Sequence, residues 1–351
     1  MTHTPPLAGT ATGRPTPIGI PTPTGTPPPT PTPTPTRRIL RALAIVACVP
    51  YISLKVAWIA GSEIGIPAGS VLLDHRTLLI VANSVSVVMD AMVVLLALLL
   101  TQPWGLRVRA WLLAFPMWAA TGLLSPIMVG FPAQLVLSLF AGPRKPEAGG
   151  RPFLDEWVFG AVYGGFIGQG LALGALFVLY TRDRWGHVWR GTMGDLPARL
   201  SGTAVRVTAV VAALLALAPS AVRLMWALGG AHGLSAGQIS QRTGEFHLLE
   251  WVRLLFTVVA VVTVLMLVFA GNLRRRTGSL PVRTPLGLAW VATGGVGCWG
   301  AYMTLVAFLP DTDPDKAFTG LARLTYAGEM IIGFLLAACV AAFLRRRSAS
   351  A

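Results

Sequence analysis

Residues 50–61 read PYISLKVAWIAG and complete an apolar run that begins near residue 39. A run of about 20 apolar residues is what a helix needs to cross the hydrocarbon core of a bilayer. This run nevertheless carries a cation, Lys55, close to its end. A second stretch, PSAVRLMWALGG at residues 219–230, again places a cation, Arg223, shortly before a tryptophan. Both stretches predict membrane-spanning helices and raise the question of what a cation does inside each.

The composition of the whole chain is that of an integral membrane protein. Of its 351 residues, 54% are hydrophobic and only 12% are charged, and the mean hydropathy is +0.65. An ordinary soluble domain carries about 25% charged residues. The net charge of +14 comes from short basic clusters between apolar runs, where the positive-inside rule places them. We therefore expect a lipid bilayer, and no nucleic acid, as the partner of this chain.

Eight apolar runs are long enough to cross a bilayer. Because no water satisfies a free backbone group inside lipid, each run must be a helix. The chain is therefore expected to be all-α, a polytopic bundle of about eight transmembrane helices. The predicted spans cover residues 39–60, 77–100, 110–131, 157–180, 204–228, 250–271, 286–308 and 326–344.

The basic residues predict how these spans are oriented. Successive loops and tails between the spans lie on alternate sides of the membrane. The flanks on one side hold 16 Lys and Arg residues, and those on the other side hold 7. Since cytoplasmic flanks carry the excess, both termini are predicted to be cytoplasmic, with the protein in the cell (plasma) membrane. The apolar stretch FPAQLVLSLFAG at residues 131–142 is too short for another crossing, and we expect an interfacial or re-entrant helix there.

The N-terminal segment, residues 1–36, has a different composition. It contains 12 Pro and 12 Thr and no acidic residue, so it cannot bury enough apolar surface to fold. We predict a disordered, polyproline-like cytoplasmic tail at residues 1–36 and a second, short cytoplasmic tail at residues 346–351.

Two matches between distant segments predict an internal duplication. One match has a constant offset of 168 residues and pairs Lys55, Trp58 and Gly61 with Arg223, Trp226 and Gly229. The other has an offset of 163 residues and pairs Tyr163, Gly165, Arg182 and Arg184 with Tyr326, Gly328, Arg345 and Arg347. We expect two parallel four-helix repeats, at residues 37–203 and 204–345. The alternative is chance, because Trp and Tyr gather at membrane interfaces in any such protein.

The two cations admit two interpretations. Each side chain is long enough to snorkel to the headgroups, or each faces the bundle interior and meets an anion. Asp90 lies near the middle of the second span, where a short carboxylate must be protonated, paired or exposed to water. It is either a neutral packing residue or part of a proton or ligand path. The sequence predicts a polar cavity near the outer leaflet, with the candidates Lys55, Asp90, Gln169, Arg223 and Glu329.

Other patterns concern helix packing and metals. Gly160, Gly164 and Gly168 recur every four residues in the fourth span, which favours close helix packing over a nucleotide-binding loop. His75 and His247 lie beside acidic residues and are loosely spaced candidates for a metal site. The three cysteines lie in apolar runs and form no CxxC pair. No disulfide, zinc site or cofactor is therefore predicted.

Several longer segments resemble a group of multi-span membrane proteins of high-GC actinobacteria. They read PFLDEWVFGAVYGGFIGQGLALGALF, YTRDRWGHVW and GSVLLDHRTLLIVANS. The resemblance extends over most of residues 37–345 and implies no activity, cofactor or site residue. Some similar sequences carry the label of an aromatic ring-opening dioxygenase, which would imply a soluble non-haem iron enzyme. The eight predicted spans contain no histidine, so the residues do not support that label.

The sequence leaves two classes of function open. In the first, two halves enclose a polar cavity that binds or transports a small or amphipathic solute. In the second, the protein is a membrane sensor or assembly partner, and the same polar residues only hold helices together. An enzymatic activity has no support, because the sequence contains no nucleophile–base–acid arrangement, phosphate-binding loop or HExxH motif. The oligomeric state stays open.

Overall fold

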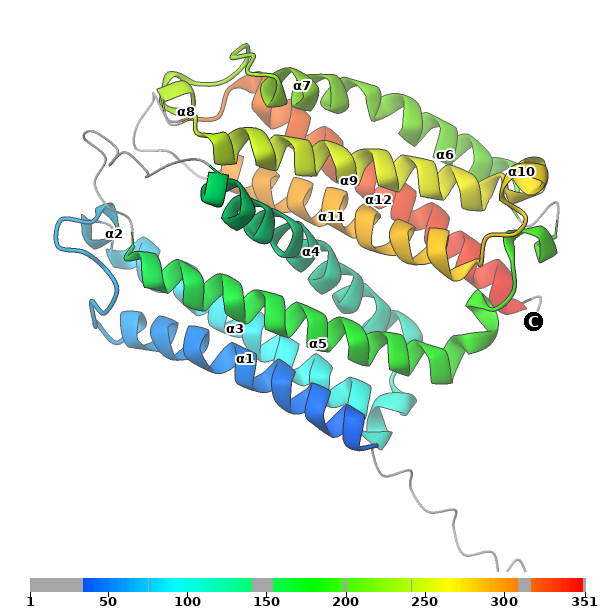
Figure 1. Ribbon diagram of the computed structural model, residues 1–351, viewed down its shortest axis with the longest axis horizontal. Helices are drawn as coiled ribbons and strands as arrows, with labels where there is room; N and C mark the ends of the chain where they lie inside the picture. Colours follow the sequence, from blue (N-terminus) through cyan, green and yellow to red (C-terminus); the bar gives the residue numbers. More distant parts are fainter. Residues whose placement is uncertain are drawn as a thin grey trace, which may run out of the picture. The chain divides into compact units, whose positions relative to one another are not determined.

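The computed structural model describes residues 34–74, 76–140, 154–197, 201–240, 242–308 and 317–349. Residues 1–33 of the predicted tail, residues 350–351 and His75 lie outside these ranges. The described residues form helices joined by loops (Figure 1). The elements are α1 (Pro35–Ile59), α2 (Val71–Asp74), α3 (Arg76–Thr101), η1 (Pro103–Arg107), α4 (Ala110–Phe140), α5 (Glu156–Trp189), η2 (Met193–Asp195), α6 (Thr203–Leu215), α7 (Leu217–Ala227), α8 (Ala236–Ser240), α9 (Gly244–Val268), α10 (Ala270–Thr277), α11 (Arg283–Phe308) and α12 (Gly320–Ala349).

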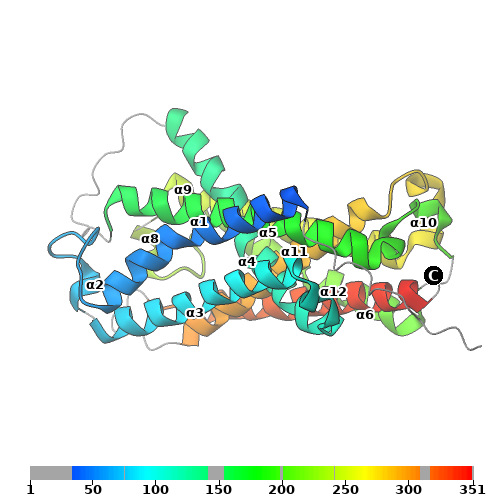
Figure 2. The same ribbon diagram turned by 90° about the horizontal axis from the view of Figure 1, so that it is seen from below.

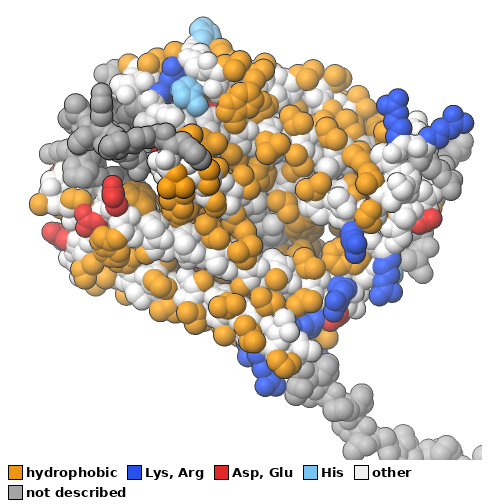
Figure 3. Space-filling model, in the orientation of Figure 1, with side chains coloured by type: hydrophobic (Ala, Val, Ile, Leu, Met, Phe, Trp, Pro, Cys, Tyr) orange, Lys and Arg blue, Asp and Glu red, His pale blue; other side chains and the backbone are white. Residues whose placement is uncertain are grey.

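Among the described residues, eight helical segments are long and apolar enough to cross a membrane, which confirms the predicted multi-pass bundle. They are α1, α3, α4, α5, the pair of α6 and α7, α9, α11 and α12. Figure 3 shows apolar side chains spread over the middle of the molecule, and many of them are exposed. Lipid solvates such a surface, whereas water does not. The chain is therefore a membrane protein in contact with a bilayer.

The expectation of a separate interfacial or re-entrant helix at residues 131–142 is wrong for the described part. Residues 131–140 continue α4 without a break, although the helix contains Pro116, Pro126 and Pro132. A proline removes one backbone hydrogen bond and bends a helix, but the helix can continue beyond it. Figure 2 shows the last turns of α4 diverging from the neighbouring helices.

The fifth span also departs from a single straight helix. It consists of α6 and α7, which meet at Ala216. Pro219 lies in the first turn of α7 and has no N–H to donate to the carbonyl group of Leu215. The missing hydrogen bond allows the chain to bend at this point, and the bend directs α7 towards α9 and α12.

The two ends of the bundle differ in charge. α1 begins and α12 ends at the end where α10 lies, on the right of Figure 1, and we call this the arginine-rich end. Figure 3 shows most Lys and Arg side chains gathered there. Asp and Glu side chains lie mainly at the opposite end, where α2 and α8 lie. Basic clusters from several parts of the chain thus converge on one end of the bundle.

Each half of the chain has its own hydrophobic core. In the first half, α1 to α5, the core includes Leu96 of α3 and Leu173 of α5. In the second half, α6 to α12, it includes Leu267 of α9 and Leu336 of α12. Inside a bilayer, helices associate through the close packing of such side chains, because the exclusion of water does not drive their association there. Each half therefore packs mainly on itself, except for α4, which packs more extensively against α11 and α9 than against α5 and α3.

The halves meet where α4 crosses α11. The sequence W-x-A-T-G occurs in both helices and ends at Gly122 in α4 and at Gly294 in α11. A Cβ added to Gly122 would lie 2.3 Å from the carbonyl carbon of Gly294, so a larger residue does not fit. Across the same crossing, the indole Nε1 of Trp118 donates a hydrogen bond of 3.1 Å to Oγ1 of Thr293. The two copies of the motif therefore hold the halves together.

The loops after α1 and α7 share one conformation. Gly61 and Gly229 both have φ of 96°, a left-handed conformation that favours glycine. The indole Nε1 of Trp58 donates to the backbone carbonyl six residues later at 2.8 Å, and that of Trp226 does the same at 3.0 Å. Both features recur at the offset of 168 residues found in the sequence.

The predicted close packing at Gly160 and Gly164 is absent from the described chain. A Cβ added to either glycine would meet no atom within 4 Å, and one added to Gly168 would make an ordinary contact of 3.5 Å with Ala47. The close approach of α1 and α5 is at Gly165, where an added Cβ would lie 2.9 Å from the carbonyl oxygen of Ala47. Gly164 lies about 100° around the helix from Gly165, so the face that carries Gly160 and Gly164 is not the one that approaches α1 most closely.

Candidate functional site

Arg223 of α7 is the centre of a buried ion-pair cluster in the second half. Its side chain is only 1% exposed. Nε and Nη2 donate to the two carboxylate oxygens of Glu329 at 2.7 and 2.8 Å, and Nη1 donates to Glu250 at 2.7 Å. A buried charge is tolerated when it is paired and hydrogen-bonded. All three nitrogens of this guanidinium have a carboxylate partner, and the group faces the bundle interior rather than the headgroups.

A second arginine, Arg253, lies close to this cluster on α9. Its Nη1 is 3.5 Å from Glu250, and 23% of its side chain is exposed. The ring of Tyr326 packs against both guanidinium groups, with its centroid 4.9 Å from Arg223 and 5.9 Å from Arg253. The two arginines and two glutamates, Glu250 and Glu329, balance in charge. Arg253 is the loosely held member of the group.

Lys55 of α1 belongs to a different cluster, in the first half. Its Nζ lies 4.4 Å from the centroid of the Tyr51 ring, and Lys55 interacts electrostatically with Asp90 of α3. Both charged side chains are buried, at 8% and 4% exposure. Within the described residues, no hydrogen bond or close ion pair joins them. Lys55 therefore interacts with Asp90, whereas Glu329 is bound to Arg223.

Two polar atoms of the first half are buried without a hydrogen-bond partner among the described residues. They are Oδ2 of Asp90 and Oε1 of Gln169. At a rise of about 1.5 Å per residue, both residues lie about 20 Å from the end of the bundle where their helices, α3 and α5, begin. Two unsatisfied oxygen atoms thus lie at the same depth in the core of the first half.

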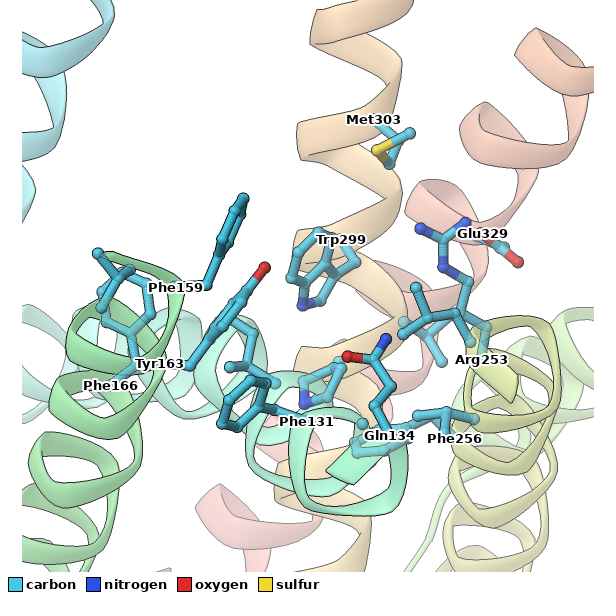
Figure 4. Close-up of a pocket in the computed structure, with 18 of the residues that line it drawn as sticks. Phe131, Gln134, Phe159, Tyr163, Phe166, Arg253, Phe256, Trp299, Met303 and Glu329 are labelled. Carbon is cyan, nitrogen blue, oxygen red and sulfur yellow. The ribbon is translucent and has the colours of Figure 1, made fainter. Parts of the chain in front are cut away.

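A pocket of about 380 Å³ lies between the two halves. Its walls come mainly from α4 and α5 of the first half and from α9 and α11 of the second half. Figure 4 shows Phe131, Phe159 and Tyr163 on one side, which we call the aromatic wall, and Arg253 and Glu329 on the other. A pocket with a large apolar surface and a few polar groups is typical of small-molecule sites.

Ring contacts hold the aromatic wall in place. The ring centroids of Phe131 and Tyr163 are 4.6 Å apart, and those of Phe159 and Tyr163 are 6.3 Å apart. Trp299 of α11 lines the pocket between the two sides (Figure 4). Its Nε1 donates a 3.0 Å hydrogen bond to the carbonyl of Leu123, so its polar atom is already engaged. The rings therefore offer a mainly apolar surface to whatever enters, and the hydroxyl group of Tyr163, which points towards Trp299, is its polar atom (Figure 4).

The structure divides the residues predicted from the sequence between two places. Of the five candidates, the pocket is lined by Arg223 and Glu329 and not by Lys55, Asp90 or Gln169. The sequence interpretation missed Glu250 as a partner of Arg223, and it missed Arg253 as a pocket residue. A signal was present, because an acid and an arginine three residues apart inside an apolar run share one face of a helix.

The metal candidates have other surroundings. Nδ1 of His247 lies 3.1 Å from the carbonyl oxygen of Trp226. Nowhere in the described ranges do three His, Cys, Asp or Glu side chains come together so that they could hold a metal ion. His75 lies outside the described residues.

No protein-family model matches this sequence, and no curated protein or solved structure is significantly similar to it.

Proposed function

We propose that this membrane protein binds an amphipathic molecule in the pocket between its two halves. The observation that carries the proposal is that the aromatic wall and Arg253 lie on opposite sides of one pocket. Aromatic rings pack well against an apolar body. Within the described part of the chain Arg253 makes one long hydrogen bond, which leaves most of its five N–H donors to a ligand. The pocket thus suits a molecule with one apolar and one polar end.

The polar end of this ligand is a group that accepts hydrogen bonds, such as a carboxylate or a phosphate. A guanidinium group binds either in a bidentate manner. Among the described residues Glu329 makes no hydrogen bond with Arg253, and both of its carboxylate oxygens accept from Arg223. Gln134 of α4 lies in the same pocket, and its amide adds a donor.

The two halves, we further propose, are copies of one four-helix unit, and the pocket is a transport site between them. The matched loops after α1 and α7 and the two W-x-A-T-G motifs support this. Transporters built from repeats bind their substrates at the repeat interface and work by rocking one repeat against the other. The crossing of Gly122 and Gly294 would be the contact about which the halves rock.

The proposed orientation places both termini in the cytoplasm and the pocket nearer the outer leaflet of the cell membrane. The gathering of Lys and Arg side chains at the arginine-rich end supports it (Figure 3). An introduced cysteine at Glu63, in the loop after α1, should react with a membrane-impermeant maleimide on intact cells. One at Ser279, after α10, should react only after permeabilisation. The reverse pattern would overturn the orientation.

One observation favours the alternative, a sensor or assembly role without a ligand. All three guanidinium nitrogens of Arg223 already have carboxylate partners, so this part of the site can hold α7, α9 and α12 together by itself. Ligand binding separates the two functions, because an assembly partner needs no occupant in the pocket.

Photolabelling of the purified full chain in detergent with a diazirine-bearing long-chain fatty acid tests the proposal. Labelling should map to α4 and α5, and an unlabelled fatty acid should compete for it. Arg253→Gln should weaken this competition by about tenfold, the loss expected for one charge-assisted interaction. Arg323→Gln, which removes an exposed cation of α12, is the matched control.

The matching long-chain alkylamine tests the headgroup. It should compete poorly, because it offers Arg253 a second cation. If the amine competes as well as the acid, or if Arg253→Gln binds like the wild type, the ligand proposal is wrong and the assembly role is favoured.

A further inference from the structure

The first half holds a buried lysine where the second half holds a buried arginine. Lys55 and Arg223 lie 168 residues apart, before matching Trp residues. An arginine side chain does not lose its proton in a protein, whereas a lysine side chain can do so when it is buried. Arg223 is therefore a permanent charge, and its carboxylate partners are at 2.7 to 2.8 Å. Lys55 has no carboxylate at such a distance among the described residues, and its Nζ lies over the Tyr51 ring.

The positions that supply these carboxylates in the second half are neutral in the first. An offset of 167 residues, which aligns the buried faces of α3 and α9, places Asn83 where the second half has Glu250. The offset of 163 residues places Phe166 where it has Glu329. The acid of the first half, Asp90, lies about 10 Å further along α3 than Asn83. This displacement explains why Lys55 and Asp90 interact without a close ion pair.

Two opposite charges that are buried but not in contact are unfavourable. A proton relieves this, because a protonated Asp90 has no charge to bury. It also gains a donor, and its Oδ2 has no hydrogen-bond partner among the described residues. Oε1 of Gln169 lies at the same depth on α5 and likewise lacks a partner there. A hydrogen bond from a protonated carboxyl group to this amide oxygen would satisfy both atoms.

We propose that Asp90 is a proton-binding site, whose carboxylate takes up one proton from water and releases it again, while Lys55 stabilises the deprotonated state. Uptake forms one O–H bond at the carboxylate and breaks none within the protein. The titratable groups that interact electrostatically with Asp90 are Cys48, Tyr51 and Lys55, all from α1. Tyr302 of α11 interacts in the same way with Tyr51. Gln169 is placed near Asp90 by its depth on α5, which packs against α3.

This site goes beyond the pocket, whose lining does not include Asp90. The ring of Tyr51 contacts that of Phe166, which lines the pocket, so the two sites are neighbours. The proposed proton-binding carboxylate and its lysine both belong to the first half. In a transporter, a titrating carboxyl group near the middle of the membrane supplies a means of coupling solute movement to protons. The proton site would thus give one half of the protein a role that the other half does not have.

Infrared spectroscopy of the full chain in lipid nanodiscs tests the proposal. A carboxylic-acid C=O band should appear and disappear reversibly between about pH 4 and about pH 10, and Asp90→Asn should remove it. Glu63→Gln, which removes an exposed carboxyl group from the loop after α1, is the control and should leave the band in place. In Lys55→Gln the acid band should persist to higher pH, because the deprotonated carboxylate loses its cation.

Two results would overturn the proposal. One is a titrating spectrum of Asp90→Asn identical to that of the wild type. The other is loss of the band on adding sodium ions at constant pH, which would make the site a metal-cation site. Should Asp90→Asn fail to fold, Asp90→Glu keeps a carboxyl group and must show a titrating band at a shifted frequency. The measurement needs no ligand, so its outcome is independent of the pocket.

Discussion

The buried cations of the two halves occupy matching places and are held in opposite ways. Arg223 is fixed by three hydrogen bonds to two carboxylates, whereas Lys55 lies over the Tyr51 ring and only near Asp90. The cations are alike in position, and the side chains of the neighbouring helices make the difference. The Arg223 cluster is a permanent contact between α7, α9 and α12. The pair of Lys55 and Asp90 is suited to change its net charge when Asp90 takes up a proton.

The largest expected effect comes from removing the fixed cation. Arg223→Gln leaves Glu250 and Glu329 buried without the partner that satisfies them. We expect the free energy of unfolding to fall by about 3–5 kcal/mol, the usual cost of breaking a buried ion pair by removing one partner. A denaturant titration in detergent micelles measures it. A loss below about 1 kcal/mol would show that the cluster contributes little to stability.

A double-mutant cycle sharpens this result. Glu329→Gln in the Arg223→Gln background should recover part of the loss, because it removes one stranded carboxylate. Arg223→Lys should fall between wild type and Arg223→Gln, since an ammonium group cannot reproduce the fork of a guanidinium. Equal losses for the single and double variants would contradict direct coupling between the two side chains.

The next effect concerns the crossing that joins the halves. Gly122→Ala and Gly294→Ala each place a methyl group within 3 Å of the facing backbone, and overpacking of this kind costs about 1–3 kcal/mol. Gly160→Ala is the matched control, because its Cβ would meet no atom within 4 Å. It should be neutral or slightly stabilising, as alanine favours a helix over glycine. The same denaturant titration compares all three variants, and equal losses would contradict a close contact at the crossing.

The helices could be predicted from the sequence, whereas the motif that joins the halves was missed. Eight apolar runs were enough to identify the spans, since lipid permits no other spanning structure for such runs. The repeated W-x-A-T-G at Gly122 and Gly294 is visible in the sequence. Its meaning required the structure, because close approach depends on how two helices cross. The continuation of α4 beyond Pro132 was missed for a related reason, as packing decides whether a proline ends a helix.

The partners of the charges were harder to predict. Each residue turns a helix by about 100°, so a shift of one position moves a side chain to another face. Glu329 was a cavity candidate together with both cations, and the packing of α12 against α7 decides that its partner is Arg223. Glu250 was only one of the acidic residues near His247, the candidate for a metal site, and its contact with Arg223 was not expected. The pocket takes residues from several helices, and no local pattern in the chain contains that information.

Lys55 should contribute less to the free energy of unfolding than Arg223 does. Lys55→Gln leaves Asp90 without its nearest cation, but a carboxyl group can take up a proton and become neutral. We expect a loss of about 1 kcal/mol, the scale of a single polar contact, in the same denaturant titration. Adding Asp90→Asn to the Lys55→Gln variant should lower the free energy of unfolding only slightly further. A loss as large as that of Arg223→Gln would show that Lys55 and Asp90 form a permanent ion pair, which would contradict the difference between the halves.

The smallest effect on stability is expected at Arg253, although it lies beside the fixed cluster. Its one hydrogen bond to Glu250 is 3.5 Å long, and Glu250 keeps its contact with Arg223 when Arg253 is gone. Arg253→Gln should therefore change the free energy of unfolding by less than about 0.5 kcal/mol, as Arg323→Gln should. A loss close to that of Arg223→Gln would mean that Arg253 is a structural member of the cluster. Its N–H groups would then be engaged, and the pocket would lack the cation that a ligand headgroup needs.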